Sequence, residues 1–177
     1  MAEPLTHHES HVLAVIRKWE PVTAYFVRKA LRQSLASSFS DSPGSVYPII
    51  ERLKRRGYVT AQAALDSGRK AELLACTPRG ESAIVEWLVR VDESDLLPED
   101  PWRTRVLFSD LLDPPAQVEW LQKLRSAAEA ELDAIKGRLQ MSTVPKEADA
   151  AEGARLQTEA RLIWLDRLMA RSISREG

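Results

Sequence analysis

Residues 42–59 of the chain read SPGSVYPIIERLKRRGYV, and they give the strongest indication of the fold. Ser42 predicts a helix N-cap and Pro43 the first helical position. Apolar residues then recur at helical spacing, while basic residues gather elsewhere: Val46, Ile49, Ile50 and Leu53 against Arg52, Lys54, Arg55 and Arg56. Gly57 predicts a left-handed cap, and Tyr58 to Ala61 predicts a strand. A basic amphipathic helix is therefore followed at once by a strand.

The sequence on either side of this stretch completes a recognisable order of elements. Thr6 and Glu9 form a capping-box pattern that opens a helix to about Lys18, and a second helix can start near Thr23. After the strand, residues 66–68 predict a turn, 70–76 a returning strand, and 77–78 the start of a fourth helix. Three helices, a hairpin and a helix are typical of a winged helix-turn-helix, whose third helix enters the DNA major groove.

The second half of the chain predicts a separate helical domain. The acidic, proline-marked stretch 92–101 predicts a linker between a domain of residues 1–91 and one of residues 102–177. A short helix is expected from Asp100-Pro101 and a long one from Asp113-Pro114. A break is expected from Met141 to about Ala148, followed by a last helix. The fold class is therefore mainly α, with a two-stranded wing and C-terminal helices.

The last two helices predict an interface between two copies of the chain. The last helix is apolar over more than half of its circumference around residues 162–169, and the small C-terminal half has few elements to cover it. A three-helix bundle of one chain is the alternative. The residues expected to form the dimer contact are Leu121, Leu124, Leu132, Ile135, Leu139, Leu162, Leu165 and Met169.

Charge and composition limit the class of protein. The 177 residues carry a net charge of -1, but residues 1–90 hold 13 Lys and Arg against 9 Asp and Glu, whereas residues 91–177 hold 12 against 17. Only the first half suits a polyanion such as DNA. No apolar run is long enough for a membrane span and the N-terminus lacks signal-peptide features, so we expect a cytoplasmic protein without membrane contact. A single cysteine, Cys76, excludes an internal disulfide.

The basic helix predicts contacts with the DNA backbone. Backbone N–H groups at Gly44 and Ser45 would face a phosphate at the helix N-terminus, and the Tyr47 hydroxyl follows one turn later. The alternatives are a core role for Tyr47 and a solvated face for Arg55 and its neighbours. The helix contains no Asn or Gln to read bases, so specificity would depend on few contacts and on DNA shape. The predicted DNA-binding residues are Ser42, Gly44, Ser45, Tyr47, Pro48, Lys54, Arg55, Arg69 and Lys70.

Other candidate sites are weaker. His7, His8 and His11 lie close together, but no acidic partner completes a metal motif, so solvated histidines and no metal or other cofactor are expected. Cys76 is expected to be a buried, inert thiol. The sequence contains no catalytic motif, so we expect no enzyme.

Aromatic side chains in the C-terminal half would either fill the core or stack on a small aromatic or hydrophobic effector: Trp102, Trp120 and Trp164.

Residues 42–59 strongly resemble the recognition-helix signature of the PadR family of transcriptional regulators. The later blocks Gly68-Arg69-Lys70 and Thr77-Pro78-Arg79-Gly80 resemble the family's wing and fourth helix. Phe108 and Trp164-Leu165-Asp166 are similar to positions of the virulence-activator type of C-terminal domain. Two places depart from the pattern, because 23–25 read TAY where many members have His-Gly-Tyr, and 71–72 read AE where an aromatic residue is usual.

The resemblance implies a homodimer that binds a pseudo-palindromic operator, is expected to act as a repressor, and responds to phenolic or drug-like molecules. The alternative function is a winged-helix module that docks on protein rather than DNA, since one fold serves both uses. The basic third helix with Gly44-Ser45 at its tip favours DNA.

Overall fold

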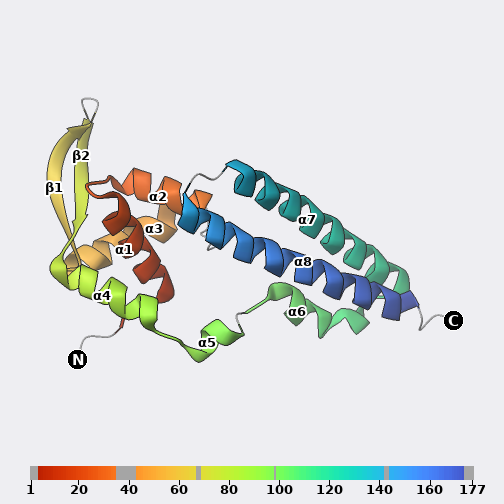
Figure 1. Cartoon of the computed structure of the whole chain (residues 1–177). Helices are drawn as coiled ribbons and strands as arrows, with labels where there is room; N and C mark the ends of the chain where they lie inside the picture. The colour runs from red at the N-terminus through yellow and green to blue at the C-terminus, as the bar shows by residue number, and fades with distance from the viewer. Residues whose placement is uncertain (1–3, 35–42, 67–68, 98, 142–143, 174–177) are drawn as a thin grey trace. The chain divides into compact units, whose positions relative to one another are not determined.

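The computed structural model describes residues 4–34, 43–66, 69–97, 99–141 and 144–173, which fall into two compact units (Figure 1). The first unit is Met1–Asp95 and the second is Leu96–Gly177. The architecture is mainly helical with one two-stranded antiparallel sheet, which confirms the predicted fold class. None of the helices in these described ranges has the length and apolar character that crossing a membrane requires.

The first unit has the predicted order of three helices, a hairpin and a helix. Its elements are α1 (His7–Trp19), α2 (Ala24–Gln33), α3 (Pro43–Arg55), β1 (Val59–Asp66), β2 (Arg69–Cys76), α4 (Pro78–Val89) and α5 (Glu93–Leu96). The short helix α5 spans the unit boundary and was not predicted, because its stretch was expected to be a linker.

Threonine caps fix where three of these helices begin. Thr6 and Glu9 form the predicted capping box on α1. Thr23 accepts a hydrogen bond from the Phe26 N–H at the start of α2, and Thr77 caps α4 in the same way. Gly57, with a φ of 74°, ends α3 as predicted. The predicted Ser42 cap lies outside the described residues.

The hairpin is longer than the sequence indicated. β1 pairs with β2 from Val59 opposite Cys76 to Asp66 opposite Arg69. The prediction ended the first strand at Ala61 because residues 61–65 show no clear alternation of apolar and polar side chains. Val22, just before α2, also exchanges backbone hydrogen bonds of 3.1 and 2.7 Å with Leu74 of β2. The wing is thereby attached to the helices at its base.

The core of the first unit lies between α1, α2, α3 and the base of the hairpin. Ile16, Leu31 and Leu53 are fully buried there, and Leu74 brings the wing into the same cluster. Gly80 marks the closest approach of α4 to the hairpin. A Cβ atom at this position would lie 2.5 Å from the Tyr58 carbonyl oxygen, so only glycine fits without a shift.

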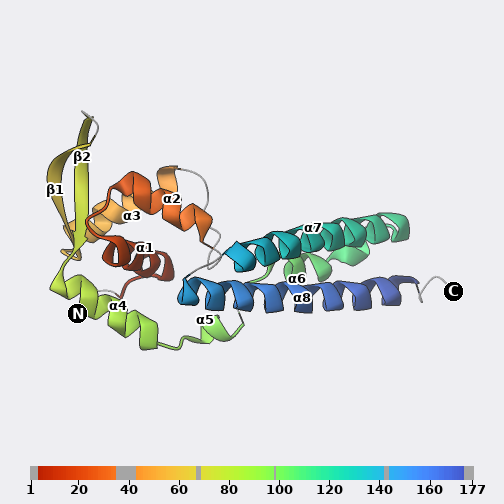
Figure 2. The same ribbon diagram turned by 45° about the horizontal axis from the view of Figure 1, so that its top comes forward.

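The second unit is a long antiparallel helix pair with a short helix beside it (Figures 1 and 2). Its elements are α6 (Pro101–Val106), the 3₁₀ turn η1 (Ser109–Leu111), α7 (Pro114–Met141) and α8 (Pro145–Ile173). The predicted break from Met141 to Ala148 was wrong in its second half, because α8 begins at Pro145. Proline is favoured at a first helical position, where its missing N–H costs nothing.

One arginine of α8 holds α6 in place. The Arg161 guanidinium donates a 2.8 Å hydrogen bond to Asp100 and lies 4.7 Å from the centre of the Trp102 ring. Asp100 is also the N-cap of α6, as predicted. The start of α6 is therefore fixed to the helix pair by both an ion pair and a cation–π contact.

Candidate nucleic-acid interface

The third helix presents one face to the core and the other to solvent. Val46 and Leu53 are buried, whereas the Tyr47 side chain is 40% exposed and Pro48 beside it is also exposed. Glu51 and Arg55 continue this outer face one and two turns later. The alternative that Tyr47 is a core residue is therefore excluded.

A buried carboxylate fixes the orientation of α3. Glu9 of α1 has only 6% of its side chain exposed, and it receives Arg52 at 3.0 Å and Arg56 at 3.5 Å. Burial by itself would raise the pKa of Glu9, but the Thr6 N–H and the two arginines outweigh it and hold that pKa below its usual range. Arg52 and Arg56 thus attach the helix to α1, a role that the sequence did not reveal.

Lys54, predicted to neutralise a phosphate, is occupied in this structure. Its Nζ lies 2.7 Å from Glu72 Oε2 on β2 and 3.0 Å from Glu51 Oε1 on α3. Hydrogen bonds to these two carboxylates raise the pKa of Lys54 above its ordinary value. Sequence reasoning missed the contact with Glu72. The departure from the family pattern at Ala71-Glu72 is the one sequence feature that marks this position as unusual. The sequence does not reveal which basic residue pairs with the Glu72 carboxylate.

The remaining predicted DNA-binding residues are only partly described. Arg55 is exposed and forms no ion pair within the part of the chain that the structure describes. Gly44 and Ser45 lie in the first turn of α3, whose backbone N–H groups have no partner within a helix. Arg69 and Lys70 begin β2. The side chains of these last four residues, and all of Ser42, lie outside the description.

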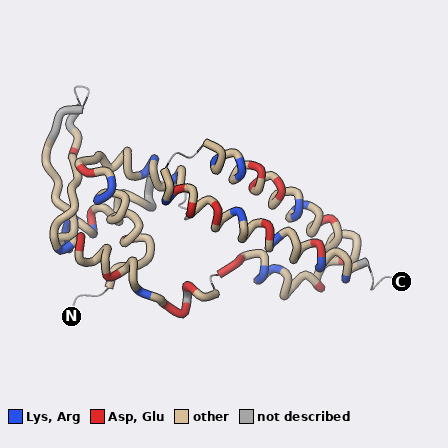
Figure 3. The backbone as a smooth tube through the Cα atoms, in the orientation of Figure 1, with Lys and Arg blue, Asp and Glu red and all other residues tan. Residues whose placement is uncertain are grey.

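Charges in the second unit are paired along the helices. Figure 3 shows acidic and basic residues alternating along α7 and α8. Several of them pair one turn apart, as Lys123 does with Glu119 and Arg155 with Glu152. Because residues 91–177 are net acidic, the first unit is the part of the chain that suits a polyanion.

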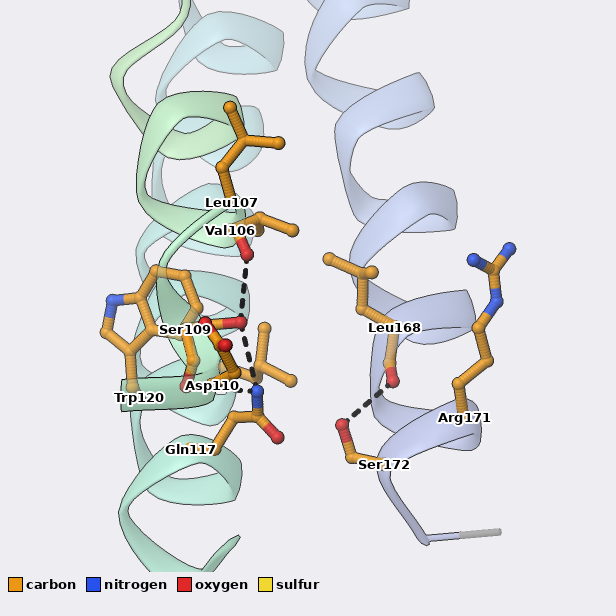
Figure 4. A pocket seen from close by; sticks show the side chains of 10 residues that line it. Val106, Leu107, Ser109, Asp110, Gln117, Trp120, Leu168, Arg171 and Ser172 are labelled. Atoms are coloured by element: carbon orange, nitrogen blue, oxygen red, sulfur yellow. Dashed lines mark hydrogen bonds between the residues drawn. The ribbon is translucent and has the colours of Figure 1, made fainter. Parts of the chain in front are cut away.

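A cavity of about 280 Å³ lies between η1, α7 and α8 in the second unit (Figure 4). Figure 4 shows Leu168 of α8 facing Val106 and Leu107 across the opening. Gln117 Nε2 donates to the Ser109 carbonyl at 3.2 Å, which fixes the amide in the wall. The other lining residues are Asp110, Trp120, Leu121, Arg171 and Ser172.

The three tryptophans considered for an effector are therefore not equivalent. Trp120 lines the cavity. All three tryptophans are half-buried against the core formed by Leu121, Leu124, Ala128 and Leu165, but Trp102 and Trp164 do not line the cavity. Sequence alone could not separate these cases, because all three lie on amphipathic helices.

The residues predicted to form a dimer contact also differ in burial. Leu121, Leu124, Leu132, Ile135 and Leu165 are buried within the helix pair of a single chain. Leu139, Leu162 and Met169 are half-buried. The large apolar side chains that the second unit leaves exposed are others, among them Leu107 (75%), Phe108 (61%), Leu111 (82%), Leu156 (52%) and Ile163 (55%).

The histidines and the cysteine have ordinary surroundings. Among the described residues, no group of three or more His, Cys, Asp or Glu side chains is placed to hold a metal. The His7 ring packs edge-on against Trp87 of α4 at 5.6 Å. Burial, with the nearby Glu20 and Glu81, raises the pKa of Cys76 to about 11. The thiol is therefore protonated at neutral pH, as an inert cysteine would be.

Comparison with known proteins places the first unit in a family. Residues 12–86, from α1 to α4, match the model of the transcriptional regulator PadR-like family. The chain carries a PadR-like domain. This domain contains every described residue of the outer α3 face and the bridge from Lys54 to Glu72. Among curated proteins, none matches the chain in sequence.

Solved structures share the fold of the PadR-like domain and of the helices that follow it. Bacillus subtilis PadR in complex with operator DNA is 17% identical with a TM-score of 0.81, and the match covers 96% of this chain and 99% of that one. The same protein in complex with p-coumaric acid is 17% identical with a TM-score of 0.73, covering 93% and 97%. The Vibrio cholerae virulence activator AphA is 16% identical with a TM-score of 0.73, covering 94% and 98%.

These likenesses establish the winged-helix fold with C-terminal helices. Because the sequence identities are low, they show the fold alone. The PadR-like family is one of transcriptional regulators rather than enzymes, which fits the expectation that this chain is not an enzyme.

Proposed function

We propose that the chain is a sequence-specific transcriptional regulator that binds a pseudo-palindromic operator as a homodimer. The observation that carries this proposal is the outer face of α3, where Tyr47, Pro48 and Arg55 are exposed while the Glu9 bridge fixes the opposite side to α1. A rigid helix with a free polar face is what major-groove docking needs. The Bacillus subtilis PadR structure with operator DNA supports the same use of a PadR-like domain.

In the proposed complex, most contacts go to the DNA backbone. The N–H groups of the first α3 turn, at Gly44 and Ser45, would bind a phosphate, and we assign further phosphate contacts to Ser42 and the Tyr47 hydroxyl. Arg55 would neutralise a further phosphate. The wing residues Arg69 and Lys70 would neutralise phosphates of the neighbouring DNA backbone. Such contacts set affinity and salt dependence, so sequence preference would depend on few base contacts and on DNA shape.

The proposed homodimer would use the second unit. Leu107, Phe108 and Leu111 lie together after α6 and are each more than half exposed. Ile163 adds an exposed apolar side chain on α8. Exposed apolar clusters of this kind usually mark an interaction surface. Five of the eight predicted contact residues are buried within one chain. The better candidates for the dimer contact are therefore the exposed side chains named above, together with the half-buried Leu139, Leu162 and Met169.

We further propose repression that responds to a small aromatic or hydrophobic effector. The cavity beside Trp120 supports this, since it combines an indole ring and aliphatic walls with the polar groups of Gln117 and Arg171. The complex of Bacillus subtilis PadR with p-coumaric acid shows that one protein of this fold binds a phenolic acid. A regulator of chromosomal genes would act in the cytoplasm, which is the location that we propose.

The test compares two tyrosine substitutions in a fluorescence anisotropy titration with the upstream region of the chain's own gene. Tyr47→Phe removes an exposed hydroxyl from the outer α3 face, and roughly tenfold weaker binding is expected for a lost hydrogen bond to a charged group. Tyr58→Phe is the control, because Tyr58 is buried between the guanidinium groups of Arg56 and Arg79.

Equal affinities of the wild type and the Tyr47→Phe variant would remove Tyr47 from the interface. If the wild type binds no duplex even at low salt, the protein-docking alternative takes the place of the proposed function.

A further inference from the structure

The bridge at Lys54 gives the proposed DNA-binding surface an unexpected local charge. Lys54 has 21% of its side chain exposed, whereas the two carboxylates that hold it, Glu51 and Glu72, are 60% and 58% exposed. The cation is thus enclosed and the anions face outward. The three charges of the bridge, one positive and two negative, therefore sum to -1.

A DNA phosphate would meet this arrangement unfavourably. Lys54 Nζ has three N–H groups, and two of them are directed to the carboxylates. A phosphate would have to displace at least one carboxylate before it gained a full contact with Lys54. Until then the exposed carboxylates would repel it.

The two carboxylates are not equivalent. Glu51 lies three residues before Lys54 on the same helix, so it remains a neighbour of the lysine wherever the wing lies. Glu72 comes from β2, makes the shorter contact at 2.7 Å, and joins the wing to the recognition helix. Glu72 is therefore the residue that links the position of the wing to the availability of Lys54.

We propose that Glu72 is a positioning residue that holds Lys54 in a carboxylate bridge and thereby lowers the affinity of the PadR-like domain for DNA. The inference rests on the proposed function, because it concerns the same surface. The bridge acts on backbone phosphates and not on base edges. Its effect is therefore the same for an operator and for a random duplex.

The experiment measures the Kd of the intact protein by fluorescence anisotropy for two duplexes, the chain's own upstream region and a random sequence, over a series of salt concentrations. Glu72→Gln keeps the shape of the side chain and removes its charge. We expect binding to both duplexes to tighten roughly threefold per protomer, as the worth of an exposed ion pair implies, and about tenfold for a dimer. The slope of log Kd against log salt should steepen by about 0.9 for each phosphate gained.

Two further variants separate the bridge from a general charge effect. Glu86→Gln changes the charge of the first unit by the same amount on α4, where Glu86 is exposed and forms no ion pair with any residue of the described ranges. Its Kd should stay near that of the wild type. In a Lys54→Gln background, the gain from Glu72→Gln should be clearly smaller than in the wild type, because only the direct repulsion between the Glu72 carboxylate and the phosphates is then removed.

The inference is overturned if Glu72→Gln and Glu86→Gln have the same Kd, or if the gain from Glu72→Gln is as large without Lys54 as with it. A gain limited to one of the two duplexes also overturns it. If no protein, wild type included, binds either duplex at low salt, the proposed function has failed and the inference with it. Thermal unfolding of each variant confirms that it is folded.

Discussion

Gly80 offers the sharpest test of how the PadR-like domain is packed. It lies in the first turn of α4, three residues after the Thr77 cap, where the helix packs against the hairpin. A Cβ atom at this position would lie 2.5 Å from the Tyr58 carbonyl oxygen and 2.6 Å from Cys76 Sγ. The sulfur could rotate away, but the carbonyl belongs to the backbone, so α4 or the chain at Tyr58 must shift to accept an alanine.

The expected cost of Gly80→Ala follows from two opposing effects. Overpacking a tight site costs about 1–3 kcal/mol, while replacing glycine by alanine within a helix returns about 0.5–1 kcal/mol. We expect a net loss of about 1 kcal/mol in the free energy of unfolding. Gly137→Ala in α7 is the matched control, because an added Cβ meets no atom within 4 Å there. The control should gain about 0.5–1 kcal/mol.

Urea unfolding followed by circular dichroism measures both variants. The two substitutions should move the unfolding midpoint in opposite directions with an unchanged slope. Equal midpoints for Gly80→Ala and the wild type would refute the close approach of α4 to the hairpin. A loss of stability in Gly137→Ala would instead refute the open surface along α7.

Four further predictions follow from the same structure. Glu9→Gln should lower the stability of the first unit at neutral pH, and this loss of stability should shrink as acid protonates the wild-type carboxylate. Because the pKa of Glu9 is lowered in the folded protein, the stability that the charged carboxylate adds is complete above the usual carboxyl range and is lost as the pH falls through the pKa of the folded state. A loss of stability that does not change with pH in acid unfolding would contradict the bridge to α1. Arg55→Gln should flatten the dependence of log Kd on log salt by about one per protomer, and an unchanged slope would take Arg55 off the phosphates. Truncation after Val91 should give a monomer, and sedimentation that shows a persistent dimer would place the interface in the PadR-like domain. Cys76, with a pKa of about 11, should react slowly with iodoacetamide at neutral pH and about tenfold faster for each added pH unit, whereas fast reaction at neutral pH would show an activated thiol.

Local chemistry made much of the fold predictable. The capping threonines Thr6, Thr23 and Thr77 each act within three residues of their partner, so a single sequence contains the whole interaction. The residues of α7 that the sequence assigned to a dimer contact do share one apolar face, because helical spacing alone determines which side chains share a face. Which surface covers that face is a separate question, and here it is α8 of the same chain.

Contacts between distant residues were not predictable. Glu9 meets Arg52 across 43 positions, and Lys54 meets Glu72 across 18. Charged residues on amphipathic helices have many possible partners, and only the packing of α1, α3 and the wing selects among them. The prediction of a break around Pro145 failed for a local reason, since proline ends helices in their interior but is favoured where they begin.

The most direct test of the central claim is a gel shift of the intact protein with the upstream region of its own gene, at two salt concentrations and with an excess of random duplex as competitor. We expect saturable binding that survives the competitor and weakens steeply as salt is raised, because phosphate contacts supply much of the affinity of a specific complex. Binding that the random duplex removes completely, or no binding at low salt, would contradict a sequence-specific regulator.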